Sequence, residues 1–111
     1  MSQLTFRNGS VAVNMVFASQ WGCEQTNVSF YQVVAIKGKK TVVVRRIRSQ
    51  VVETESSMSG SKKALLNDFM DDSTLTRRVA DYSTVPLIEI SSYESAYLHD
   101  INEECWFSSW A

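Results

Sequence analysis

A short turn between two runs of β-forming residues constrains the fold more than any other feature. Residues 28–36 and 41–47 are rich in valine, isoleucine and aromatic side chains, and they flank the turn segment 37–40. Such runs are typical of strands, and Gly38 readily adopts the positive φ that a short hairpin loop requires. The sequence therefore predicts an antiparallel hairpin, and the three valines at 42–44 predict burial of its second strand on both faces.

Other turn signals divide the rest of the chain into short strand-like runs. Asn8-Gly9, between residues 4–6 and 11–17, predicts a first hairpin with a type I′ turn, whose two central residues both need positive φ. Further strands are predicted at 75–82, at 87–90 after Pro86, and at 106–110, whereas 93–98 is ambiguous.

Two segments in the middle of the chain look less regular. The serine-rich stretch 56–63 is expected to be a flexible loop by its composition. Leu65, Leu66, Phe69 and Met70 fall at helical spacing, so residues 64–70 are compatible with one or two helical turns.

Five to seven short strands in 111 residues indicate one β-rich domain spanning residues 1–111. We expect a mostly-β fold, or an α+β fold with one short helix near 62–72. The architecture expected is a small antiparallel barrel or a strongly bent sheet. Trp21 and Trp106 stand beside strand-like segments, so we expect both rings to be buried.

Charge is distributed unevenly, although the net charge is only −1. Between Gln25 and Val52 there are six basic residues and no acid: Lys37, Lys39, Lys40, Arg45, Arg46 and Arg48. From Val79 onward there are six acids and no lysine or arginine: Asp81, Glu89, Glu94, Asp100, Glu103 and Glu104. Either the two segments neighbour and neutralise each other, or they form two surfaces that meet different partners.

The basic hairpin is the main candidate for a binding site. Lysine and arginine neutralise phosphates, and exposed rings such as those of Phe30 and Tyr31 stack unpaired bases. The alternative is an edge hairpin whose lysines only prevent aggregation. A recognition loop is the second candidate, with Trp21, Gln25, Asn27 and Tyr31, although its amides would also suit buried backbone groups.

Little in the sequence indicates catalysis, a cofactor or a metal. His99 is the only histidine, no Gly-x-Ser-x-Gly elbow occurs, and the two cysteines lack paired ligand spacing. We therefore expect a protein that is not an enzyme. The apolar runs are too short for a signal peptide or a membrane helix, so we expect a cytoplasmic protein with no membrane partner. Cys23 and Cys105 are expected to be reduced, and their pairing stays open.

Residues 19–34 carry a resemblance to a known group of proteins. The stretch SQWGCEQTNVSFYQVV, together with 38–47, 58–60, 91–97 and 107–111, resembles a group of short uncharacterised proteins encoded by bacteriophages, plasmids and other bacterial mobile elements. Members usually have tyrosine where Trp110 stands. The resemblance implies a genomic context, and hence a bacterial host cell, but no activity.

Two functions follow as hypotheses. The first is an accessory protein that binds a host protein, and so inhibits a host defence protein or a nuclease. The second is direct nucleic-acid binding through the basic hairpin 37–48. A net charge near zero favours the first, because dedicated DNA-binding domains are usually basic overall. The target, the oligomeric state and the choice between basic and acidic surface are left open.

Overall fold

Ten strands make up the regular structure of the described residues. The computed structural model of the chain describes residues 3–21, 27–56, 59–92, 94–100 and 105–108, and at 20–21, 27, 51–60 and 105–108 it describes the backbone alone. The strands are β1 (Gln3–Phe6), β2 (Gly9–Ala12), β3 (Val16–Trp21), β4 (Asn27–Lys37), β5 (Thr41–Ser56), β6 (Ser59–Phe69), β7 (Leu75–Ala80), β8 (Leu87–Ser91), β9 (Glu94–His99) and β10 (Cys105–Ser108). No helix occurs within these residues, which confirms the mostly-β prediction.

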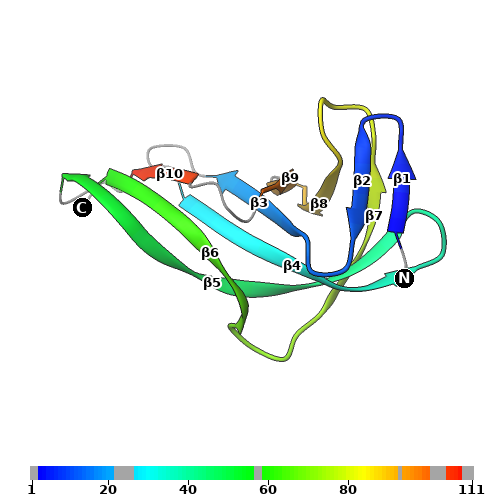
Figure 1. Cartoon of the computed structure of the whole chain (residues 1–111), viewed down its shortest axis with the longest axis horizontal. Helices are drawn as coiled ribbons and strands as arrows, with labels where there is room; N and C mark the ends of the chain where they lie inside the picture. Colours follow the sequence, from blue (N-terminus) through cyan, green and yellow to red (C-terminus); the bar gives the residue numbers. More distant parts are fainter. Residues whose placement is uncertain (1–2, 22–26, 57–58, 93, 101–104, 109–111) are drawn as a thin grey trace.

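Six of the strands close into an antiparallel barrel: β5, β4, β3, β9, β8 and β7 (Figure 1). The order along the main sheet is β10-β6-β5-β4-β3-β9-β8-β7, and β7 pairs again with β5. The long strand β5 serves two neighbours, because its part from Thr41 to Val44 pairs with β7 and its part from Ile47 onward pairs with β6. Strands β6 and β10 therefore extend the sheet beyond the barrel. The predicted small barrel is confirmed.

The hairpin predicted around Gly38 is confirmed as β4 and β5. Lys37 pairs with Thr41, and Gly38 has a φ of 66° in the loop between them. The valines at 42–44 are all buried, so the second strand does have two apolar faces next to the turn. Because both strands belong to the barrel wall, this short loop holds its lysines at a fixed place on the surface.

The N-terminal hairpin also forms, but its turn differs from the predicted one. Phe6 pairs with Gly9, so the loop consists of Arg7 and Asn8, and Asn8 does not have a positive φ. A Cβ added to Gly9, whose φ is 149°, would lie 3.1 Å from Cδ of Pro86. The close approach to Pro86, rather than a type I′ turn, therefore explains the glycine.

This hairpin packs against the barrel as a separate two-stranded sheet. Leu4 of β1 and Val11 of β2 are buried in the same cluster as the barrel interior. The Asn8 side chain fastens the turn, because its Nδ2 donates a hydrogen bond to the Ser83 carbonyl at 3.0 Å. The hairpin thus stands beside the loop that joins β7 to β8.

Two asparagines with positive φ show why two sequence-based boundaries were wrong. Asn14, with a φ of 77°, turns the chain between β2 and β3, so residues 11–17 form two strands rather than one. Asn67, with a φ of 67°, lies within β6, where residues 65–68 bulge out of the pairing with β5. The apolar spacing at 64–70 therefore belongs to a bulged strand, and the predicted helical turns are wrong.

The serine-rich segment is strand as well. Strand β5 runs on to Ser56 and β6 begins at Ser59, so the prediction of a flexible loop is wrong for residue 56 and for residues 59–63. Residues 57–58 lie outside the described part of the chain. Serine is compatible with an extended strand when its neighbours supply the ladder hydrogen bonds, so composition alone misled here.

Buried apolar side chains form two clusters. The larger one fills the barrel: Leu4, Val11, Phe17, Tyr31, Val33, Val42, Val44, Val79, Ile88 and Ala96. The smaller one comprises Val16, Val28, Phe30, Ile47 and Ala64 of β3 to β6. Phe17 and Phe30 are the largest fully buried rings, one in each cluster. The expected burial of Trp21 and Trp106 concerns side chains outside the described part.

The barrel closes at a short seam between β7 and β8. These strands share only two residue pairs. Beyond them the Arg77 guanidinium bridges the gap, because its Nε donates to the Glu89 carbonyl at 3.0 Å and its Nη2 to the Ile90 carbonyl at 3.1 Å. A charged side chain thus replaces ladder hydrogen bonds that the diverging strands cannot make.

Candidate interaction surface

The six basic residues of the predicted hairpin site do not form one patch. Lys37, Lys39 and Lys40 lie at the tip of the β4–β5 hairpin, whereas the arginines at 45, 46 and 48 lie further along β5. The five residue-to-residue steps from Thr41 to Arg46 span about 17 Å at about 3.3 Å per step. The structure therefore separates a lysine group from an arginine group.

Two of the arginines are engaged by carboxylates at the end of β6 and in the bend that follows it. Nη2 of Arg45 lies 3.3 Å from Oδ1 of Asp72, and the Arg45 guanidinium carbon lies 3.9 Å from the centre of the Phe69 ring. Nη1 of Arg48 lies 2.7 Å from Oδ1 of Asp68. Among the described residues, the carboxylate partners of these two arginines thus come from 68–72 rather than from the acidic C-terminal third.

The third arginine borders a buried polar network. Nη2 of Arg46 donates to Oγ of Ser29 at 3.0 Å. Oε2 of Glu94 accepts hydrogen bonds from Oη of Tyr31 at 3.0 Å and from Oγ of Ser19 at 2.7 Å. This network joins β3, β4, β5 and β9 on the inner side of the barrel wall.

Tyr31 is a core residue, which argues against the recognition and stacking roles considered for it. Only 4% of the residue is exposed, so its ring presents no free face to a base. Burial, together with the hydrogen bond to Glu94 and the charge of its carboxylate, raises the pKa of the Tyr31 phenol to about 12. The phenol therefore stays protonated where an exposed tyrosine ionises.

Because of this raised pKa, the free energy of unfolding should fall as the pH rises through the alkaline range. Because the folded-state pKa is above the unfolded value of 10.0, the contribution is fully present below pH 10 and is lost as the pH rises toward 12. We expect Tyr31→Phe to be less stable than the parent at pH 8, and the gap to narrow between pH 10 and 12. Urea unfolding at each pH measures both chains, and a gap that stays constant would contradict this assignment.

The remaining predicted loop residues lie mostly outside the described part of the chain. Trp21 and Asn27 pair with each other at the end of the β3–β4 ladder. Their side chains, and all of Gln25, are outside the described residues, as are Cys23 and Trp110.

The lysine tip gains an arginine from a strand that is distant in sequence. In the β5–β7 ladder Arg78 pairs with Thr41, the residue that follows Lys40. We call Lys37, Lys39, Lys40 and Arg78 the tip surface; all four are exposed. Within the described ranges no carboxylate forms an ion pair with them.

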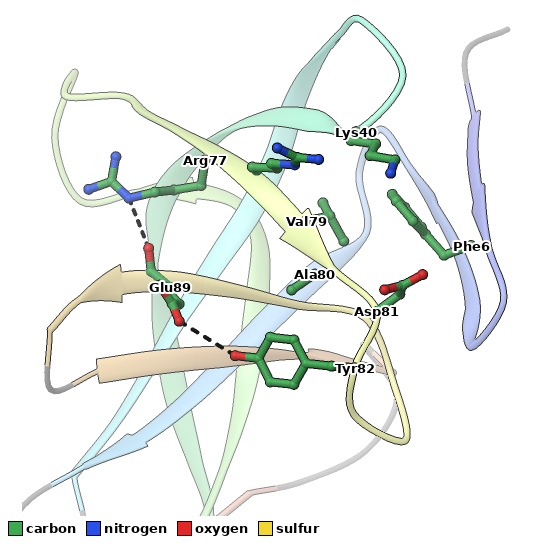
Figure 2. Close-up of a pocket in the computed structure, with 9 residues that line it drawn as sticks. Phe6, Lys40, Arg77, Val79, Ala80, Asp81, Tyr82 and Glu89 are labelled. Carbon is green, nitrogen blue, oxygen red and sulfur yellow. Dashed lines mark hydrogen bonds between the residues drawn. The ribbon is translucent and has the colours of Figure 1, made fainter.

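A pocket of about 440 Å³ opens beside the tip surface. Figure 2 shows Val79 and Ala80 in its middle, Lys40 and Phe6 near one another, and Tyr82 next to Glu89. Tyr82 is 65% exposed, and its Oη lies 3.5 Å from Oε1 of Glu89, a long hydrogen bond. The pocket therefore combines an apolar floor with aromatic, cationic and anionic side chains.

The described residues contain neither a metal site nor a spanning helix. No group of three or more histidine, cysteine, aspartate or glutamate side chains among them is placed to hold a metal ion. None of their elements is a helix long and apolar enough to cross a membrane.

His99 packs against Phe30, with ring centres 5.8 Å apart.

Sequence reasoning missed Arg78, Phe6 and Tyr82, and it named Glu89 only as a member of the acidic segment. Phe6 lies in β1, Arg78 in β7, Tyr82 just after β7 and Glu89 in β8. Only the closure of the barrel brings these residues to the lysine tip. No local spacing signals such a meeting. No protein-family model, curated protein or solved structure matches the chain.

Proposed function

We propose that the chain is a non-catalytic accessory protein that binds a host protein through its tip surface. The observation that carries this is a set of four exposed cations on a fixed hairpin and its neighbouring strand, with no carboxylate partner among the described residues. Unpaired surface charges steer association with a complementary surface and fix its orientation. An acidic patch on the partner is the chemistry that they suit.

A protein suits this surface better than a nucleic acid. Glu89 lines the pocket beside Lys40 and Arg78, where its carboxylate would repel a continuous phosphate backbone. Arg45 and Arg48 are already engaged by Asp72 and Asp68, so the hairpin offers fewer cations than its sequence suggested. A small cationic patch with acidic neighbours and an exposed tyrosine resembles a protein interface.

The proposed role follows from the resemblance to proteins of phages, plasmids and other mobile elements. Such a protein, acting inside the bacterial cell, would occupy the surface of a host defence protein or nuclease and so inhibit it. Covering a site requires a rigid scaffold and a complementary patch, and it requires no catalytic group. In support of the proposal, the barrel is a closed scaffold and the tip surface carries four exposed cations.

Site-specific crosslinking tests this proposal. A photoreactive amino acid at position 39 should crosslink one host protein in a bacterial lysate, with and without nuclease treatment. The same amino acid at position 63, on β6, should not. Lys63→Glu is the matched control for Lys39→Glu, because both substitutions change the charge by the same amount. Lys39 is exposed and Lys63 is half-buried. We expect only Lys39→Glu to abolish capture of that protein; a crosslink that nuclease removes, or equal loss in both variants, would contradict the proposal.

A further inference from the structure

We propose that the pocket beside the tip surface binds a free guanine nucleotide. This goes beyond the proposed protein partner, because it assigns a small ligand to a concave site. The pocket of about 440 Å³ lies within the range of about 300–1,000 Å³ that is usual for small-molecule sites. Three features of its lining, described below, select the ligand.

The floor and rings suit a flat heteroaromatic base. Val79 is 3% exposed and forms the apolar bottom with Ala80. Phe6 and Tyr82 border the same pocket, and Tyr82 keeps most of its ring surface in solvent. Every nucleobase has a π-face that stacks on such a ring, and stacking is favourable whichever base is present.

The cations on one side suit a phosphate. Lys40 and Arg78 both line the pocket, and neither has a carboxylate partner among the described residues. The third cation, Arg77, is held by backbone carbonyls of β8 and serves the barrel seam instead. An ammonium and a guanidinium that line one pocket can both donate charge-assisted hydrogen bonds to phosphate oxygens.

The carboxylate on the other side selects guanine. Among the described residues, Oε1 of Glu89 has only the long contact of 3.5 Å with the Tyr82 hydroxyl, so they leave its acceptor capacity largely unused. An ionised carboxylate accepts hydrogen bonds and donates none. Guanine presents two neighbouring N–H donors on one edge, N1–H and the N2 amino group, and adenine has no such pair.

The arrangement of charge favours a free nucleotide over a strand. Cations border the pocket through Lys40 and Arg78, whereas Glu89 places a carboxylate in the same lining, and the second acid there, Asp81, is paired with Arg7 at 3.6 Å. A single strand continues with a second phosphate beyond the base, and a groove for it normally carries cations along its length. One phosphate is accommodated here, and a second would meet an acid.

Nuclear magnetic resonance titration of the full chain with GMP tests the proposal. We expect saturable shifts of the backbone amides of Val79, Ala80 and Tyr82, with AMP, guanosine and inorganic phosphate each binding at least fivefold more weakly. Tyr82→Ala should weaken GMP binding about tenfold through lost stacking. Tyr97→Ala is the control, because this tyrosine is 44% exposed on β9 and does not line the pocket.

Two further variants separate the parts of the site. Arg78→Met should weaken GMP binding and leave guanosine binding unchanged, and Glu89→Gln should weaken GMP binding more than AMP binding. Both side chains are exposed, so neither change should unfold the chain. The proposal is overturned if GMP causes no saturable shift at these amides, if phosphate alone binds as tightly, or if a guanine-containing single strand binds more than tenfold tighter than GMP.

Discussion

Replacing Phe17 by alanine should lower the free energy of unfolding by about 3–5 kcal/mol, the usual cost of deleting a fully buried phenylalanine. Phe17 has no exposed surface and packs among the side chains that fill the barrel. Its neighbours come from strands that are already closed into a ring, so they cannot collapse fully into the space left behind. Urea unfolding, monitored by tryptophan fluorescence, measures the loss.

An exposed aromatic residue provides the control for this deletion. Tyr97 on β9 is 44% exposed, so Tyr97→Ala removes a ring that is only partly withdrawn from water. We expect its cost to be well below that of Phe17→Ala. Equal losses in the two variants would mean that the barrel interior is not the main source of stability.

Gln32→Leu should cost about 1–3 kcal/mol, although leucine has nearly the same size and is more apolar. Gln32 is 1% exposed, and its amide joins the turn at Asn14 to the bulge of β6 at Asn67. Nε2 donates to Oδ1 of Asn14 at 3.2 Å and to Oδ1 of Asn67 at 3.0 Å, and Oε1 accepts from the Asn67 backbone N–H at 2.7 Å. Leucine would remove all three hydrogen bonds.

The matched variant is Gln50→Leu, at an exposed position of the same sheet on β5. We expect it to change the free energy of unfolding by less than about 0.5 kcal/mol, as surface substitutions usually do. If Gln32→Leu proves as stable as the parent, the two asparagines with positive φ hold their turns without this amide.

Local signals in the sequence were sufficient for the barrel wall but not for its closure. Gly38 and the valines at 42–44 predicted the β4–β5 hairpin because turn and strand preferences act over a few residues. The bulge at 65–68 escaped prediction, since its apolar spacing imitates a helix and its cause lies partly in the amide of Gln32 on β4. Long-range contacts override local propensity in such places.

The candidate site was predicted in part for the same reason. Lys37, Lys39 and Lys40 are exposed, as a polar hairpin loop should be. The separation of the arginines followed from the length of β5, and their carboxylate partners came from 68–72. Tyr31 was predicted to be a surface ring. Side chains alternate between the two faces of β4, and the sequence does not reveal which face points into the barrel. Placing Arg78 and Tyr82 beside the lysines required knowledge of the β5–β7 pairing.

The most direct test of the tip surface as a protein-binding site is an electrophoretic mobility measurement on the wild-type chain at low ionic strength. Low salt favours any phosphate contact, because counterion release then contributes most to affinity. We expect single- and double-stranded nucleic acids of mixed sequence to migrate unshifted at micromolar protein. A tight, saturable shift that Lys39→Glu removes and Lys63→Glu does not would contradict the account and make the same surface a nucleic-acid interface.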